Sequence, residues 1–205
     1  MSQGFKLSLT ADQLLAKARE ITGIDIIDTD VVEPLTVMVK SLNEESNLHQ
    51  QGAIAMERRL LRLLSNRLRM QRDFAAHPEI AEQTVKAPIV ICSMPRTGST
   101  KMQNLLAASG DFNWLPYWQS LNPSLISGSR VESPHPRIVD AVAYYEWFDA
   151  VSPEAKYGHD LKPLEPNEES YMLEHSMRTA GFIGWSELPG YVQWLFSNDN
   201  IAIQF

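Results

Sequence analysis

Apolar residues recur every three or four positions along the N-terminal part of the chain, the spacing of amphipathic helices. Thr10 and Gln13 have capping-box spacing and Gly23 is a natural stop, so we expect a first helix between them. The same periodicity predicts a second helix over 35–42 and a longer third helix over 48–74. Several arginines stud this third helix, and we interpret them as a solvated face: Arg58, Arg59, Arg62, Arg67, Arg69 and Arg72.

The pattern changes near position 87. Four consecutive apolar residues at 89–92 form a run too short for a helix, which is typical of a strand buried on both faces of a parallel sheet. A polar turn at 93–100 follows, and a helical pattern begins at once behind it. The order of strand, turn and helix predicts an α/β fold.

Two further helices are expected in the rest of the chain, over 136–150 and 168–178. We therefore divide the protein into a helical N-terminal region at 1–86 and an α/β region at 87–205.

The turn has the composition of an anion site. A strand that leads through a short polar turn into a helix points free backbone N–H groups at one place, where the helix dipole adds positive charge. Gly98 permits a positive φ or a close approach of the backbone. Thr97, Ser99 and Thr100 add hydroxyl donors. Arg96 adds a charged planar fork that suits phosphate or sulfate oxygens.

A nucleotide-binding P-loop is the rival interpretation of this turn. That motif places a lysine between a glycine and a Ser or Thr. The sequence has no such triplet, since Lys101 follows Thr100 instead. A P-loop kinase therefore stays a weaker alternative.

Composition limits the possible partners. The formal net charge is −7, which argues against a nucleic-acid partner. Cys92 is the single cysteine, so no disulfide forms within the chain. We find neither a secretory signal nor a run of the ~20 apolar residues that a membrane helix needs. We expect a cytoplasmic protein without a membrane span.

The turn and its flanks resemble sulfotransferases that use 3′-phosphoadenosine 5′-phosphosulfate (PAPS), in the bacterial branch with a Pro-Arg-Thr-Gly-Thr-Thr loop. The loop here is Pro95-Arg96-Thr97-Gly98-Ser99-Thr100. The flanking segments that share the resemblance are 22–23, 66–68, 77–80, 88–91, 117–118, 120–123 and 159–176. The resemblance implies a P-loop-like sulfotransferase fold, a parallel sheet flanked by helices. It also implies PAPS as co-substrate, a small-molecule hydroxyl acceptor and no metal.

The resemblance also assigns roles. Arg96 would hold the phosphosulfate oxygens, and the loop from Pro95 to Thr100 would cradle the 5′-phosphate. An acceptor hydroxyl must lose its proton, so a general base is required. His159, Glu168 and Glu169 are the candidates, and His175 is a weaker one that we expect to pack along its helix.

No second strand of similar quality follows before Phe205, and the family's 3′-phosphate-binding residues have no counterpart here. We therefore expect a truncated fold, which is a fragment, the product of a split or truncated gene, or half of a two-chain protein. A second chain or a homo-oligomer would supply the missing half. The alternative is an inactive remnant that acts as an anion-binding or interaction module. Gln119 favours that alternative, because the branch more often has glutamate at this position.

Overall fold

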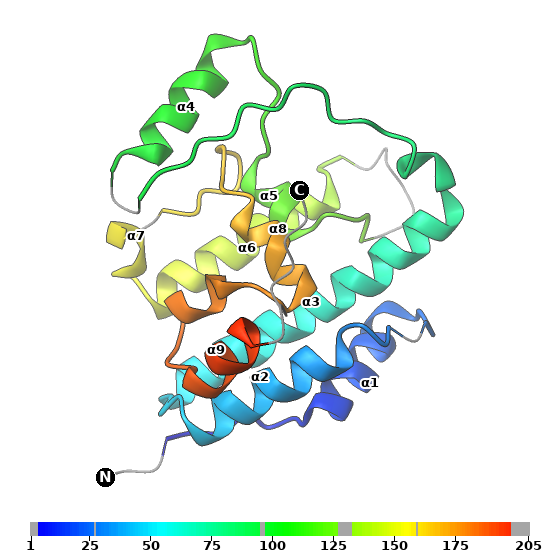
Figure 1. Cartoon of the computed structure of the whole chain (residues 1–205), viewed down its shortest axis with the longest axis vertical. Coiled ribbons are helices and arrows are strands. Elements are labelled where there is room, and N and C mark those ends of the chain that lie inside the picture. Colours follow the sequence, from blue (N-terminus) through cyan, green and yellow to red (C-terminus); the bar gives the residue numbers. More distant parts are fainter. Residues whose placement is uncertain (1–3, 27, 95–96, 127–132, 159, 198–205) are drawn as a thin grey trace. The chain divides into compact units, whose positions relative to one another are not determined.

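The computed structural model describes residues 4–26, 28–94, 97–126, 133–158 and 160–197 (Figure 1). The chain forms two compact units, one made of 1–72 and 170–205 and the other of 73–169. The sequence-based division after residue 86 stays a prediction.

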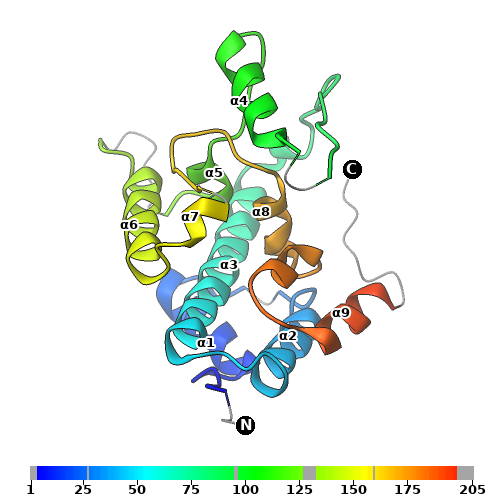
Figure 2. The same ribbon diagram turned by 90° about the vertical axis from the view of Figure 1, so that its left-hand side faces the viewer.

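Helices make up the regular structure of the described ranges, and Figures 1 and 2 show them from two sides. The α-helices are α1 (Ala11–Thr22), α2 (Val32–Glu44), α3 (Gln50–Ala76), α4 (Ser99–Ser109), α5 (Tyr117–Leu121), α6 (Pro136–Val151), α7 (Ala155–Gly158), α8 (Ser170–Leu173) and α9 (Pro189–Phe196). Short 3₁₀ helices lie at Pro78–Ile80, Glu174–Ser176 and Ala180–Gly184. No strand occurs in these ranges, where a single bridge joins Pro116 to Pro166.

Local signals position the first helices of the first unit. Thr10 and Gln13 form the predicted capping box of α1, and Gly23 ends the helix with φ 66°. Helices α2 and α3 also lie where the periodicity predicts them. Their apolar faces form one core with residues from α9 and its neighbouring turns, including Leu14, Leu35, Met38, Leu60, Leu64, Met177, Phe182, Tyr191 and Leu195.

The predicted helix over 168–178 is wrong in extent. Helix α8 stops at Leu173, a 3₁₀ turn follows, and Met177 adopts a left-handed conformation with φ 55°. The buried Tyr191 hydroxyl lies within hydrogen-bonding distance of the carbonyl oxygens of Met177 and Thr179, at 3.1 and 3.0 Å. These contacts come from α9, so the local periodicity around 168–178 does not contain them.

The interpretation of the α3 arginines as a solvated face is wrong for two of them. Arg59 is only 7% exposed, pairs with Glu174 and lies 3.9 Å from the centre of the Trp185 ring. Arg67 pairs with Asp28, which is buried. The carboxylates come from segments distant in sequence, so the helix alone does not reveal these pairs.

The second unit is built around α5, α6 and the segment before Ser170. Helix α5 packs against α6, where Arg137 lies 4.6 Å from the centre of the Trp118 ring and donates to the Asn122 carbonyl oxygen at 2.6 Å. The N–H groups of Tyr117 and Trp118 donate to carbonyl oxygens in 163–165, at 3.0 Å each.

The predicted strand at 89–92 does not pair with any described residue. The segment leads into the turn and α4 without regular structure (Figure 1), and Ile89 and Val90 are 59% and 68% exposed. A parallel strand needs neighbours that satisfy its backbone groups. The described residues provide none, so the predicted sheet is not formed by them.

None of the helices described is both long and apolar enough to cross a bilayer.

Candidate phosphosulfate site

The turn before α4 ends at Gly98, directly before the first residue of the helix. Gly98 is the N-cap, with φ 93° and ψ 16°, and its carbonyl oxygen accepts from the Met102 N–H at 3.1 Å. No side chain of a described residue caps the helix at this point. Thr97 closes the turn on the other side, because its hydroxyl donates to the Met94 carbonyl oxygen at 2.6 Å.

This geometry leaves the N–H groups of the first turn of α4 available to an anion. The left-handed φ of Gly98 is costly for residues with a Cβ. A Cβ built there would have no atom within 4 Å, so glycine is favoured by conformation and not by space. Thr97, Gly98 and Thr100 are exposed and Ser99 is half-buried. Pro95 and Arg96 lie outside the described residues.

Glu168 is connected to α4 through its neighbour Asn167. The Gln103 side-chain amide donates to the Asn167 carbonyl oxygen at 2.7 Å, and the Asn167 side chain accepts from the Glu168 N–H at 2.8 Å. Asn167 is buried and its N–H donates to the Leu115 carbonyl oxygen at 3.0 Å. Three hydrogen bonds therefore fix the backbone directly before the candidate carboxylates.

Gln103 lies on the same face of α4 as Ser99, because residues four apart are neighbours on a helix. The structure thus holds the backbone directly before Glu168 against the face of α4 that includes Ser99. Sequence reasoning missed Gln103, although its spacing from Ser99 was readable. Glu169 is exposed, and His159 lies outside the described residues.

His175 is held by protein groups at both ring nitrogens. Nδ1 donates to the Met172 carbonyl oxygen at 3.1 Å, and Nε2 accepts from the Asn66 side-chain amide at 3.0 Å, which assigns the neutral Nδ1–H tautomer. Burial lowers the pKa of His175 to about 4. It is 4% exposed, so it packs inside the first unit, as expected.

The neighbouring carboxyl is also buried. Burial raises the pKa of Glu174, while the Arg59 guanidinium acts in the opposite direction. Together with Asn66, Arg67 and Asp28 these residues form a polar network inside the first unit.

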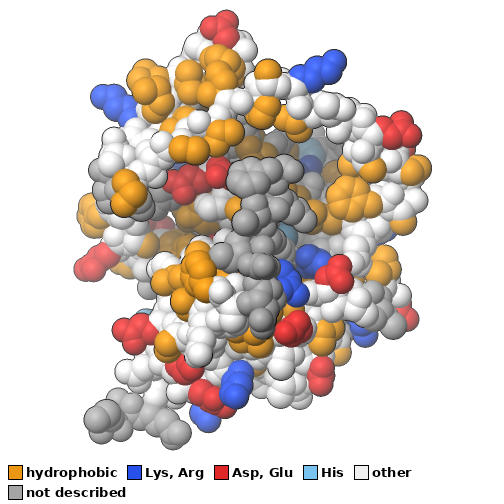
Figure 3. Space-filling view, viewed as in Figure 1, with side chains coloured by type: hydrophobic (Ala, Val, Ile, Leu, Met, Phe, Trp, Pro, Cys, Tyr) orange, Lys and Arg blue, Asp and Glu red, His pale blue; other side chains and the backbone are white. Residues whose placement is uncertain are grey.

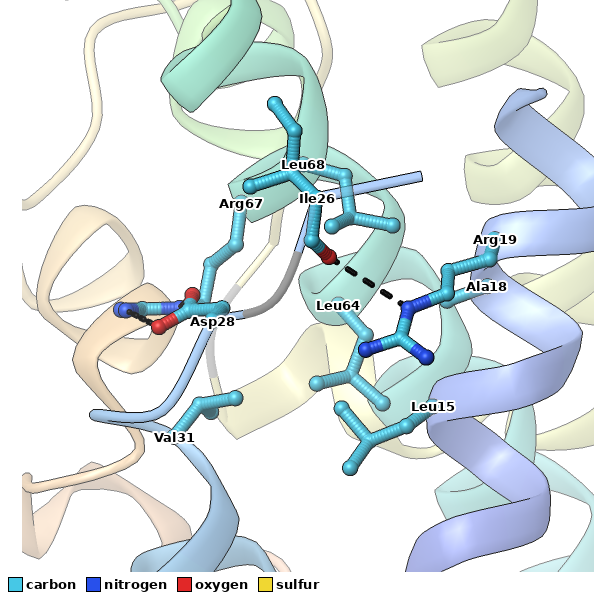
Figure 4. Close-up of a pocket in the computed structure, with 9 residues that line it drawn as sticks. All are labelled: Leu15, Ala18, Arg19, Ile26, Asp28, Val31, Leu64, Arg67 and Leu68. Carbon is cyan, nitrogen blue, oxygen red and sulfur yellow. Dashed lines mark hydrogen bonds and ion pairs between the residues drawn. The ribbon is translucent and has the colours of Figure 1, made fainter. Parts of the chain in front are cut away.

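A small hollow in the first unit contains none of the candidate residues (Figure 4). It is lined by Leu15, Ala18, Arg19, Ile26, Asp28, Val31, Leu64, Arg67 and Leu68. Asp28 binds Arg67, and Arg19 donates to the Ile26 carbonyl oxygen at 3.4 Å (Figure 4). These polar groups are satisfied by one another, so the hollow is a packing feature.

The model of the sulfotransferase family matches residues 88–202, more than half of the chain. The protein belongs to the sulfotransferase family. The match begins at the segment before the loop and includes α4, Asn167 and both candidate glutamates.

Two solved sulfotransferases are similar in structure. STF1 from Mycobacterium tuberculosis is 25% identical with a TM-score of 0.78, and the match covers 95% of this chain and 54% of that one. STF9 from Mycobacterium avium is 23% identical with a TM-score of 0.73, with 95% and 50% covered. The chain therefore spans about half the length of the solved sulfotransferases it matches. No curated protein matches it.

Proposed function

We propose that this chain carries the phosphosulfate-binding part of a sulfotransferase that uses PAPS and an acceptor hydroxyl. The observation that carries the proposal is the left-handed Gly98 at the uncapped N-terminus of α4, inside the region matched by the family model. Helix N-termini bind phosphate and sulfate groups through backbone N–H donors and the helix dipole. In this proposal Arg96 adds the main side-chain charge beside them.

The proposed reaction is an in-line transfer. The acceptor oxygen forms a bond to sulfur as the bond from sulfur to the phosphate oxygen breaks, and the leaving group is adenosine 3′,5′-bisphosphate. Such transfers depend on positioning and on charge stabilisation more than on covalent help from the protein. We assign Arg96 and the N–H groups of 97–100 to the charge on the departing phosphate.

The acceptor proton passes to a general base in this scheme. Glu168 is our first candidate because Asn167 and Gln103 tie its backbone to the face of α4 that starts at the loop. Glu169 and His159 remain proposed alternatives. The scheme requires no metal, and it is compatible with a cytoplasmic location, since the single thiol of Cys92 needs no oxidising compartment.

The test is binding of adenosine 3′,5′-bisphosphate to the purified chain, followed by NMR up to millimolar ligand. We expect shifts in the amides of 97–101, and a loss of affinity of about 10- to 100-fold in Arg96→Ala, the range of a lost charged hydrogen bond. Lys101→Ala is the matched control and should change affinity by less than about threefold. Equal losses in both variants, or unshifted loop amides, would overturn the proposal.

A second candidate is an anion-binding or interaction module without turnover. The exposed apolar side chains of Ile89 and Val90, together with the half-length match to STF1 and STF9, favour it for the isolated chain. Ligand binding without transfer to any hydroxyl acceptor, even when the unmatched half of STF1 is supplied, would support this alternative.

A further inference from the structure

Gln103 is a polar side chain that joins α4 to the segment before Glu168. Its side-chain amide donates to the Asn167 carbonyl oxygen at 2.7 Å, across 64 positions of the sequence. Gln103 is half-buried, whereas its neighbours Met102 and Leu105 are 52% and 59% exposed, and Figure 3 shows hydrophobic side chains at the surface over α4. No residue of α4, which lies wholly within the described ranges, is buried. Apolar packing alone therefore does not fix the orientation of this helix, and the hydrogen bond contributes to it.

The segment that accepts this bond is already held by backbone hydrogen bonds from another part of the chain. The N–H groups of Tyr117 and Trp118 donate to carbonyl oxygens in 163–165, at 3.0 Å each. The Asn167 N–H donates to the Leu115 carbonyl oxygen, also at 3.0 Å. These three bonds do not involve α4. We therefore expect the segment to keep its conformation when the side chain on α4 is changed.

Helix α4 connects the same side chain to the candidate loop. Gln103 lies one helical turn after Ser99, which is the first residue of α4 and follows Gly98. The hydrogen bonds of the helix make this turn one rigid piece, so Ser99 and Gln103 move together. A displacement at the loop is thus passed to the Asn167 carbonyl oxygen and, through the Asn167 side chain, to the Glu168 N–H.

We propose that Gln103 is a positioning residue that couples the phosphosulfate loop to the candidate base Glu168. This inference rests on the proposed function for the identity of the ligand and of the base. The role of Gln103 is indirect, because it acts through the Asn167 backbone. When an anion binds the N–H groups of 97–100, α4 and the tethered backbone adjust together, which sets the carboxylate relative to the transferred group. Such alignment matters because a misplacement of about 1 Å can cost about 100-fold in rate.

The contact requires a hydrogen-bond donor at position 103. The Asn167 carbonyl oxygen only accepts hydrogen bonds, so the side chain opposite it must supply an N–H or O–H group. Gln103→Glu keeps the length of the side chain and, as a carboxylate, has no donor. Gln103→Met also keeps the length and removes the donor without adding a charge. Gln103→Lys restores a donor on a side chain of similar reach.

The first measurement is amide hydrogen exchange of the purified chain without ligand, followed by NMR. We expect the Glu168 N–H to exchange about tenfold faster in Gln103→Glu and in Gln103→Met, because its acceptor on Asn167 is no longer held against α4. Gln103→Lys should restore slow exchange. The amides of Tyr117 and Trp118 should exchange as in the wild type, since their own bonds are unchanged. Faster exchange of these two amides in the donor-free variants would show that Gln103 only holds the fold, and would overturn the positioning role.

The second measurement adds adenosine 3′,5′-bisphosphate up to millimolar concentration. In the wild type we expect the Glu168 amide to shift together with the amides of 97–101. In the two donor-free variants the loop amides should still shift, and the Glu168 shift should disappear. Gln103→Lys should recover it. Asn104→Glu, at the next and exposed position, carries the same new charge as Gln103→Glu. It is the matched control, so it should keep the Glu168 shift and bind the ligand as tightly as Gln103→Glu does.

The outcomes separate this inference from the proposed function. Loop amides that shift in the wild type while the Glu168 amide does not would overturn the coupling and keep the proposed function. A Glu168 shift that survives in both donor-free variants would also overturn the coupling, because the change would then reach Glu168 by another route. Unshifted loop amides in the wild type would overturn the proposed function, and the coupling with it. Dispersed spectra establish that each variant folds, and Gln103→Met decides the question if the added charge of Gln103→Glu unfolds the chain.

Discussion

The two units of this protein treat their apolar and charged side chains in opposite ways. In the first unit Leu14, Leu35 and Leu60 are fully buried, and the charge of Arg59 is paired with Glu174 inside the core. In the second unit Ile89 and Val90 are mostly exposed, and no side chain of a described residue caps the N-terminus of α4. The first unit closes on itself because 170–197 returns to pack with α2. The second unit leaves apolar side chains at 89–91 and the first N–H groups of α4 exposed.

The largest expected effect tests the closed unit. Glu174→Ala leaves the buried Arg59 guanidinium without its carboxylate, and removal of one partner from a buried pair costs about 3–5 kcal/mol of unfolding free energy. Urea unfolding followed by circular dichroism measures it. Glu20→Ala removes an exposed pair with Lys17 and should cost at most about 1 kcal/mol. Similar losses in both variants would show that the first unit has no special dependence on this pair.

The second prediction concerns pH in the same unit. Folding lowers the pKa of His175 from 6.5 to about 4. Between pH 4 and pH 6.5 this histidine is therefore protonated in the unfolded chain and neutral in the folded chain. Stability is therefore complete above pH 6.5 and falls as pH falls towards 4, by up to about 3 kcal/mol. Unfolding at a series of pH values should show this slope.

His175→Gln isolates the histidine contribution. The raised pKa of Glu174 makes stability fall as the pH rises above 4.5, which is opposite to the effect of His175. Both proteins contain Glu174, so its effect cancels in the difference between their unfolding free energies. We expect the wild type to lose stability relative to His175→Gln as the pH falls from 6.5 to 4. His77→Gln, at an exposed position, is the control for a histidine-to-glutamine change. Parallel slopes for wild type and His175→Gln would contradict the buried neutral imidazole.

Gly98→Ala is a smaller perturbation in the open unit. The new Cβ has space, so the cost is the left-handed φ alone, about 1 kcal/mol. We expect adenosine 3′,5′-bisphosphate to bind about fivefold more weakly, because the loop relaxes away from its anion-binding conformation. Gly184→Ala, also with space for a Cβ and without a positive φ, is the control for calorimetry. Equal affinities for the wild type, Gly98→Ala and Gly184→Ala would show that ligand binding does not depend on the conformation of Gly98.

Local features of this fold were predictable and distant pairings were not. The capping box at Thr10 and the stop at Gly23 involve residues three or four apart, so the sequence alone places α1. Arg59 and Glu174 are 115 positions apart, and no neighbouring residue in the sequence indicates that Arg59 has a buried partner. The composition of 97–100 predicted a turn, and Gly98 has the positive φ that glycine permits there. The strand at 89–92 was predicted by its apolar run, but strand formation depends on neighbours that local sequence does not specify.

The smallest expected effect is the sharpest test of the comparison. Ile89 is 59% exposed in the second unit, whereas Leu60 in the first is fully buried. Leu60→Ala should therefore destabilise the isolated chain by about 2–5 kcal/mol through lost burial and a residual cavity. Ile89→Ala shortens a side chain that is mostly exposed, so little apolar burial is lost. The free energy of unfolding should stay within about 0.5 kcal/mol of the wild-type value. Urea unfolding of both variants makes the measurement, with hydrogen exchange of 87–93 as a second readout. A loss of several kcal/mol in Ile89→Ala would mean that the segment is already buried in the isolated chain, and the contrast between a closed and an open unit would then fail.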